Sequence, residues 1–286
     1  MLLKTALLSL LAVSLAVIAP AQGRKGGGQP VQPIQQVKPG LYMVAGAGAN
    51  SEIRVTPDGL IVVDGKLAGE QNYNDLMAQI KSVSSQPVKF LIVTHHHADH
   101  TGNNDRFLAA GVQVLGHENL KKNLETYRAN PVPAPPSMTY AGAETTVRLG
   151  GVAVEVHHFG RAHTSGDSVV YFPDLKTVVV SDVVTTGATG PLADYAGGGS
   201  FLEWSQVLDS ILKLDWDACI PGNGGVLTKA DVQAYKAKID TFVARAKEAV
   251  AKGVAPDQLM AQIKTDDLGF TPRAPDPAAF YAELKK

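Results

Sequence analysis

The chain has 286 residues, of which 45% are hydrophobic, and this is enough to form one large core. Its formal net charge of -1, without a long run of like charge, gives no reason to expect a nucleic acid or an anionic membrane as a partner. The single cysteine, Cys219, excludes an internal disulfide.

Residues 1–21 have the three parts of a secretory signal. A lysine at position 4 is followed by the apolar run 5–18 and by the small residues of segment 19–21. This pattern predicts export, either to the periplasm or as a secreted protein. The apolar run is short for a membrane span, so no stable membrane anchor is expected, and an uncleaved anchor helix is the alternative.

The next segment, residues 22–36, contains too few apolar side chains to pack, which predicts a flexible leader and places the folded domain at residues 37–286. The first half of that domain mixes predicted strands and helices. Strands are expected at 40–44, 52–55, 60–64, 88–93 and 112–115, and helices at 72–83 and 118–129, before a surface loop at 130–142.

Segment 94–100, with the sequence THHHADH, directly follows the predicted buried strand 88–93. In extended backbone, alternate side chains share a face, so His95, His97 and Asp99 can point the same way. His100 follows the bend into the next helix and can return toward the same cavity. Neutral imidazole and carboxylate groups are the ligands expected for zinc, with iron, manganese or cobalt as alternatives. The other interpretation is a polar loop of unrelated histidines.

In the second half of the domain, the hydrophobic period changes to two and then back to a helical spacing. Strands are expected at 145–149, 152–156, 168–172, 177–181 and 218–220, and helices at 201–214 and 230–252. Strands with helices, followed by more strands and then by helices, predict an α/β chain with two packed sheets and helices outside them.

Two further segments place polar side chains at predicted strand ends. Loop 160–167, with the sequence GRAHTSGD, carries His163, and Asp182 follows the strand that ends at Ser181. Each feature is weak by itself, because an aspartate after a strand is more often a turn former. Together with segment 94–100, these residues predict a metal site assembled from separate strand ends.

The motifs HxHxDH, GRAHTSGD, SD and PGNG, in this order and at these spacings, resemble the metallo-β-lactamase superfamily over roughly residues 37–250. The resemblance implies a four-layer αββα sandwich with a one- or two-zinc site along one edge of the two sheets. It also implies how the ligands divide: His95, His97 and His163 on the first ion, Asp99 and His100 on the second, and Asp182 bridging or assisting both.

One position departs from this family pattern. Members usually carry a histidine in a Pro-Gly-His-Gly turn, whereas this chain has Asn223. An amide oxygen is a weaker and harder donor than an imidazole nitrogen. We therefore expect one tightly bound zinc ion and a second ion that is held more weakly, with Asn223 as a weak ligand.

A zinc ion held by three histidines keeps an open position for water and lowers the pKa of that water from about 15.7 to about 7. Metal-bound hydroxide is then the expected nucleophile, and it attacks the carbonyl group of a small-molecule substrate. The resemblance implies that Asp99 orients this nucleophile and helps a proton reach the leaving group.

The substrate is predicted by resemblance alone. An exported single-domain chain is similar to the β-lactam-hydrolysing branch, so β-lactam hydrolysis is the first prediction. Asp182 is instead similar to the bridging aspartate of thioester and lactone hydrolases of the glyoxalase II and lactonase type. A metal-binding protein that has lost catalysis is a further alternative. A nucleic-acid phosphodiesterase would be expected to carry an extra domain or a basic surface, and this chain shows neither. The sequence does not indicate an oligomeric state.

Overall fold

The computed structural model describes residues 29–186 and 190–286. The predicted signal, residues 1–21, lies outside this range, and so does the first part of the predicted leader. Within the described residues, no helix combines the length and the apolar character that crossing a bilayer requires.

The first half of the chain forms a seven-stranded sheet in the order β1 to β7. Neighbouring strands are antiparallel from β1 to β4 and parallel from β4 to β7. A turn at Pro57-Asp58 joins β3 to β4, since Thr56 pairs with Gly59. The strands are β1 (Gln35–Lys38), β2 (Leu41–Val44), β3 (Ser51–Thr56), β4 (Gly59–Val63), β5 (Val88–Ile92), β6 (Gln113–His117) and β7 (Met138–Tyr140).

The second half forms a five-stranded sheet in the order β12-β11-β10-β9-β8. Its strands pair antiparallel except for β11 and β12, which are parallel. The strands are β8 (Glu144–Leu149), β9 (Val152–His157), β10 (Val169–Phe172), β11 (Thr177–Ser181) and β12 (Ala218–Pro221).

Several of the described α-helices begin at a side chain that caps them. Ser200 accepts a hydrogen bond from the amide of Glu203 at the start of α5, and Thr228 forms a capping box with Asp231 at the start of α6. The helices are α1 (Glu70–Val83), α2 (Ala98–Thr101), α3 (Asn104–Ala109), α4 (Glu118–Thr126), α5 (Phe201–Lys213), α6 (Lys229–Ala251), α7 (Leu259–Gln262) and α8 (Pro277–Leu284).

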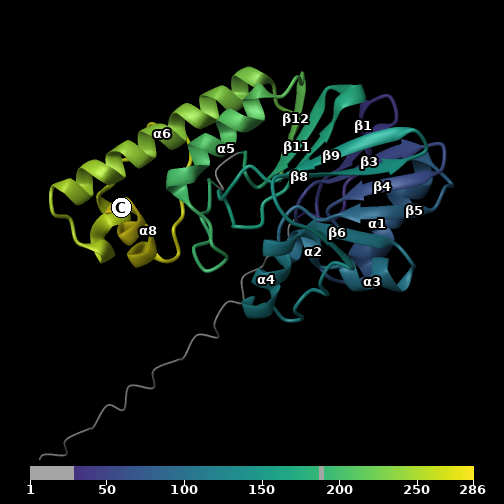
Figure 1. The fold of residues 1–286 in the computed structure, drawn as a ribbon, viewed down its shortest axis with the longest axis horizontal. Helices are drawn as coiled ribbons and strands as arrows, with labels where there is room; N and C mark the ends of the chain where they lie inside the picture. Colours follow the sequence, from purple (N-terminus) through teal and green to yellow (C-terminus); the bar gives the residue numbers. More distant parts are fainter. Residues whose placement is uncertain (1–28, 187–189) are drawn as a thin grey trace, which may run out of the picture.

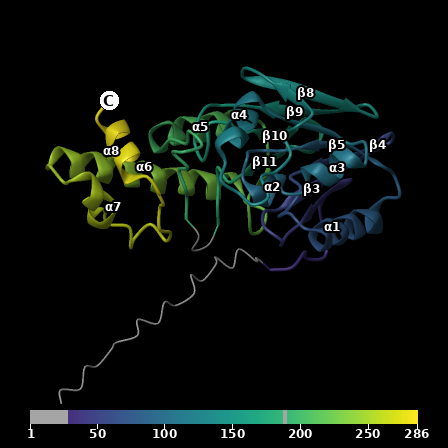
Figure 2. The same ribbon diagram turned by 90° about the horizontal axis from the view of Figure 1, so that it is seen from below.

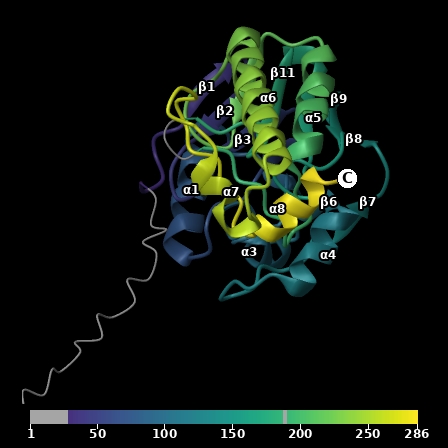
Figure 3. The same cartoon turned by 90° about the vertical axis from the view of Figure 1, so that its left-hand side faces the viewer.

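Three apolar clusters define the layers. One cluster lies between the sheets and joins Ile61 of the first sheet to Val179 of the second. Another packs α1 and α3 against the outer face of the first sheet through residues such as Ile80. The third packs α5, α6 and α8 against the outer face of the second sheet around Trp204. The chain is therefore a four-layer αββα sandwich, as the sequence predicts (Figure 1; Figure 3).

The prediction of a flexible leader is wrong for residues 29–36, which pack against the folded domain. The amide of Ala47 donates a hydrogen bond to the carbonyl of Gln29 (2.6 Å). The side chains of Val31 and Ile34 pack against the cluster beneath α1. Two apolar side chains and backbone pairing with the first sheet are enough to order this segment, although its average composition is polar.

Two other parts of the fold go beyond the sequence prediction. The segment expected to be a surface loop, residues 130–142, contains β7, which extends the first sheet beside β6. After α6, the chain turns back and adds α7 and α8, for which no element was predicted. Figure 2 shows α6, α7 and α8 at the opposite end of the molecule from α1 and α3.

Candidate metal centre

The predicted site residues meet at one edge of the two sheets. Strands β4 and β5 are parallel, as are β11 and β12, so each pair ends at a common edge. These ends carry Asp64, segment 94–100, Asp182 and Asn223, and His163 lies in the loop between β9 and β10. The edge therefore gathers side chains that are far apart in the sequence.

Three imidazole nitrogens form what we call the first donor group. His95 Nε2 lies 3.1 Å from His97 Nδ1 and 3.1 Å from His163 Nε2, and the last two atoms are 2.9 Å apart. Zinc–nitrogen bonds of about 2.0–2.1 Å in a tetrahedral site place two such nitrogens roughly 3.3 Å apart. The triangle of nitrogens is therefore close to the size that a single zinc ion requires.

The outward nitrogens of two of these rings are bonded to acceptors. His163 Nδ1 donates to the carbonyl of Leu192 (2.6 Å), and His97 Nε2 donates to the carboxylate of Asp194 (2.8 Å). A neutral imidazole carries only one proton, so the inner nitrogens of both rings present lone pairs toward each other. Facing lone pairs repel unless a cation lies between them, and the group therefore fits a divalent metal ion.

A second donor group consists of Asp99, His100 and Asp182. Asp64 accepts a hydrogen bond from His100 Nδ1 (2.7 Å). The other nitrogen, Nε2, is buried without a hydrogen-bond partner among the described residues. It lies 3.7 Å from Asp99 Oδ2 and 3.8 Å from Asp182 Oδ1. An orphaned buried nitrogen between two carboxylates fits a second cation.

Asp182 lies between the two donor groups. One of its oxygens is 3.8 Å from His100 Nε2, and the other is 3.6 Å from His163 Nε2. A carboxylate in this position can share its two oxygens between two ions. The bridging role that the sequence resemblance implies for Asp182 stays a prediction.

Burial and neighbouring charges adjust these residues differently. Burial lowers the pKa of His95 and of His163, so both rings are neutral and able to bind a metal at neutral pH. Burial also opposes the protonation of His100, but the carboxylates of Asp64 and Asp99 outweigh it and raise the pKa of that ring. Hydrogen bonding and charge from His100 lower the pKa of Asp182 in spite of its burial.

Asp194 is a site residue that the sequence did not identify. Its Oδ2 atom accepts from His97 and lies 3.4 Å from His96 Nε2. These hydrogen bonds outweigh burial and hold the pKa of Asp194 well below its usual range. A single aspartate in a glycine-rich loop gives no local signal, because only its distance to His97 in the folded chain reveals its role.

The PGNG turn approaches the second donor group through its backbone. A Cβ atom at Gly222 would lie 1.8 Å from Asp182 Oδ1, so only glycine fits at this position. Asn223 follows, and the hydroxyl of Thr186 donates to its carbonyl oxygen (2.9 Å) and approaches its Oδ1 (3.4 Å). The role of Asn223 as a weak metal ligand stays a prediction.

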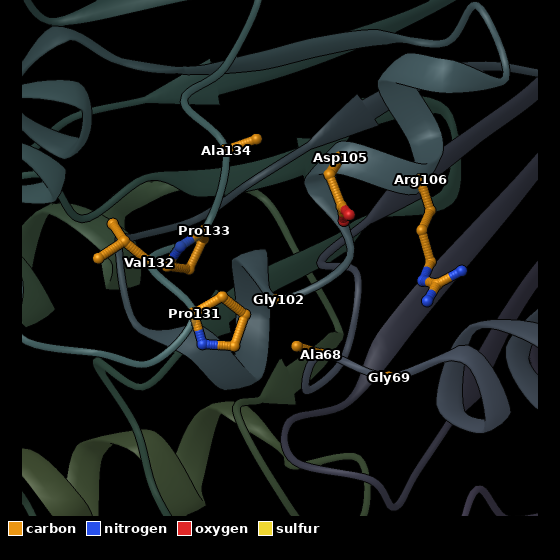
Figure 4. Close-up of a pocket in the computed structure, with 9 residues that line it drawn as sticks. All are labelled: Ala68, Gly69, Gly102, Asp105, Arg106, Pro131, Val132, Pro133 and Ala134. Atoms are coloured by element: carbon orange, nitrogen blue, oxygen red, sulfur yellow. The ribbon is translucent and has the colours of Figure 1, made fainter.

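Two cavities lie near this edge. The first has a volume of about 260 Å³ and lies beside His97, since its lining includes the adjacent His96. It is lined by His96, Asn123, Thr126, Tyr127, Arg128, Asp194, Ala196 and Gly197. The second has a volume of about 390 Å³, and neither cavity has a donor residue in its lining. Figure 4 shows this second cavity, with Pro131–Pro133 on one side and Asp105 and Arg106 on the other. The first cavity is the better candidate for a substrate pocket, because its lining includes Asp194, which accepts a hydrogen bond from His97.

Comparison with known proteins identifies similar chains. A family model described as the metallo-beta-lactamase superfamily matches residues 48–244. A solved structure of a metallo-beta-lactamase from Pontibacter korlensis has 19% sequence identity and a TM-score of 0.65, and the match covers 73% of this chain and 99% of that one.

Two further relatives are named for other activities. The 2,4-dinitroanisole O-demethylase subunit alpha of Nocardioides sp. is 30% identical over 173 residues, or 60% of this chain and 51% of the relative. A linear primary-alkylsulfatase of Pseudomonas sp. is 22% identical over 274 residues, or 76% of this chain and 50% of the relative. The chain thus spans about half the length of these two relatives.

Proposed function

The chain belongs to the metallo-beta-lactamase superfamily of metal-dependent hydrolases, and on this premise we propose that it is a zinc hydrolase that opens the ring of a β-lactam. The observation that carries the proposal is the first donor group. The inner nitrogens of His95, His97 and His163 lie within 3.1 Å of one another. Acceptors on other segments hold the outward nitrogens of the last two rings, so the site is set up for an ion before substrate arrives.

When bound, a zinc ion lowers the pKa of a coordinated water from about 15.7 to about 7 and polarises a carbonyl oxygen. The protein's own residues supply orientation and proton transfer. Asp99 has the most exposed carboxylate in the two donor groups, with 39% of its side chain accessible, so it can face both water and substrate. It can accept the proton of the attacking water and pass that proton to the leaving nitrogen of the lactam.

The β-lactam substrate is supported by likeness in shape. The metallo-beta-lactamase from Pontibacter korlensis is matched over 99% of its own length. Both donor groups lie at the edge of the sheets, where 39% of the Asp99 side chain is exposed and a small cyclic amide can reach it.

A second candidate, hydrolysis of a lactone or a thioester, is favoured by one specific observation. Asp182 lies between the donor groups, with its oxygens 3.8 Å and 3.6 Å from His100 Nε2 and His163 Nε2. An aspartate in this position is similar to the bridging aspartate of the thioester and lactone hydrolases of the superfamily. Because one relative is named a linear primary-alkylsulfatase, an alkyl sulfate is a further substrate to compare.

The test is a substrate panel on the zinc-loaded protein. Nitrocefin, a lactone, a glutathione thioester and an alkyl sulfate are compared with wild type, His97→Ala and His157→Gln. His157 contacts Glu155 and lies in neither donor group, so it serves as the matched histidine control. Nitrocefin turnover that is lost only in His97→Ala supports the proposal. Turnover confined to the lactone or thioester selects the second candidate, and absence of turnover on all four substrates refutes both.

We also propose that residues 1–21 direct export. The charged start, the apolar run 5–18 and the small residues that follow support this. Expression with a C-terminal tag in a Gram-negative host should yield a shortened chain in the periplasmic fraction. A full-length chain confined to the cytosol would contradict the proposal.

A further inference from the structure

The C-terminal segment, residues 264–286, packs on the loop that holds the metal-site histidines in place. We call residues 190–200 the site loop. It supplies both acceptors for the outward nitrogens, the carbonyl of Leu192 and the carboxylate of Asp194. The family match ends at residue 244, so the C-terminal segment lies outside it.

Backbone pairing with Arg273 orients the carbonyl of Leu192. The amide of Arg273 donates to Pro191 (2.8 Å), and the amide of Ala193 donates to Arg273 (3.0 Å), which forms a parallel bridge. In extended backbone, the polar groups of adjacent residues point to opposite sides. Bonds from Pro191 and Ala193 toward the C-terminal segment therefore direct the carbonyl of Leu192 the other way, toward His163.

Glu283 of α8 anchors the far half of the site loop. Its two carboxylate oxygens accept from the hydroxyls of Tyr195 (2.7 Å) and Ser200 (2.6 Å), and the residue is only 8% exposed. Phe280, one turn earlier, packs its ring against Phe201 at 5.3 Å. Together with the pairing at Pro191 and Ala193, these contacts fix the site loop on both sides of Asp194.

The site loop in turn supports the loop that carries His163. The amide of Asp194 donates to the carbonyl of His163 (2.9 Å), and the amide of Ser200 donates to Ala162 (2.9 Å). A shift of the site loop would therefore move the acceptor of His97 and both hydrogen-bonding partners of His163.

We propose that the C-terminal segment is a positioning element of the metal centre, with Glu283 as its main positioning residue. It acts through Tyr195 and Ser200 on the site loop, and through that loop on His97 and His163. The inference rests on the proposed metal site and extends it to a residue that touches neither ion nor substrate. It implies that metal affinity depends on a helix outside the part of the chain shared with the family.

The test compares Glu283→Gln with Asp267→Asn. The two hydroxyls donate to different oxygens of Glu283, and an amide replaces one of these oxygens by an NH2 group, so one hydroxyl loses its acceptor. Asp267 is the matched control, because it is an acidic residue of the same segment that pairs with Arg245 at the surface. Zinc affinity is measured by competition with a chromophoric chelator, and the visible absorption of the Co²⁺-loaded protein reports the ligand geometry.

Glu283→Gln should lower zinc affinity about tenfold and change the Co²⁺ spectrum, whereas Asp267→Asn should do neither. Tyr195→Phe removes the hydroxyl donor and keeps the ring, so it replaces Glu283→Gln if that variant does not fold. Tyr195→Phe should not lower zinc affinity further in a chain that already carries Glu283→Gln. A lower melting temperature with zinc affinity unchanged within twofold would overturn the proposal. Failure of the wild type to bind either metal would instead refute the proposed function.

Discussion

The two donor groups at the sheet edge are built differently. In the first, three nitrogens lie 2.9–3.1 Å apart, and hydrogen bonds to Leu192 and Asp194 hold the outward sides of His163 and His97. In the second, His100 Nε2 lies 3.7 Å from Asp99 and 3.8 Å from Asp182, and the carboxylate of Asp99 is 39% exposed.

The first group is organised by hydrogen bonds, whereas the second is organised by charge. The first group keeps its shape because Asp194 and Leu192 hold the rings of His97 and His163 by hydrogen bonds from behind. The second is held mainly by attraction between His100 and the carboxylates around it, and its exposed member can turn toward water. We therefore expect the first ion to bind tightly and the second to exchange more readily.

The largest effect should come from removing a ligand of the first group. His163→Ala should lower the affinity for the first zinc ion by more than the roughly 100-fold that loss of an outer partner costs. His100→Ala should remove only the weaker ion. Zinc per chain after dialysis, measured by elemental analysis, should be close to zero in the first variant and close to one in the second. Equal losses would mean that the groups do not differ.

A smaller loss should follow from removing the support behind His97. Asp194→Ala leaves Nε2 of that ring without its carboxylate acceptor. We expect zinc affinity to fall about 10–100-fold, as for other outer partners of metal-binding histidines. Asp174→Ala is the control, because Asp174 pairs with Arg54 and belongs to neither donor group. An affinity unchanged by Asp194→Ala would show that the ring is held by packing alone.

The second group can be strengthened at the position that departs from the family pattern. Asn223→His offers an imidazole nitrogen in place of an amide oxygen, and nitrogen is the better zinc donor. The second step of a zinc titration, followed by calorimetry, should become tighter by about tenfold while the first step is unchanged. Two ions already tight in the wild type would contradict the weak second site.

His117, a buried histidine outside both donor groups, provides a contrast to the metal-site histidines. His117 stacks on His158, with ring centroids 4.0 Å apart, and burial together with that neighbour lowers its pKa to about 4. Between this value and the unfolded pKa of about 6.5, the unfolded chain binds more protons, so stability falls as the pH decreases.

Loss of this pH dependence is the expected result of His117→Gln. Between pH 7 and pH 5, the free energy of unfolding should decrease by about 2 kcal/mol less in the variant than in the wild type. Urea unfolding of the metal-free protein at the two pH values measures this change in the free energy of unfolding. Zinc affinity should stay within twofold, in contrast to the donor-group variants. Identical pH profiles would show that His117 does not remain neutral in the folded state.

The sequence predicted the elements around the site because the signals for them are local. Hydrophobic runs marked β4, β5 and β11, and the turn residues that follow placed Asp64, segment 94–100 and Asp182 at their ends. It failed where order depends on distant contacts. Residues 29–36 and β7 are short and polar, and they are ordered only by pairing with a sheet that other segments build.

The sequence by itself determined which side chains can bind a metal, because ligand chemistry belongs to each residue and strand ends are marked locally. Only the tertiary structure decided what supports them. His97 finds its acceptor in Asp194, 97 residues away, and Tyr195 finds Glu283, 88 residues away. A hydrogen bond of this kind forms between groups that folding brings within about 3 Å, and no pattern along the chain encodes that distance.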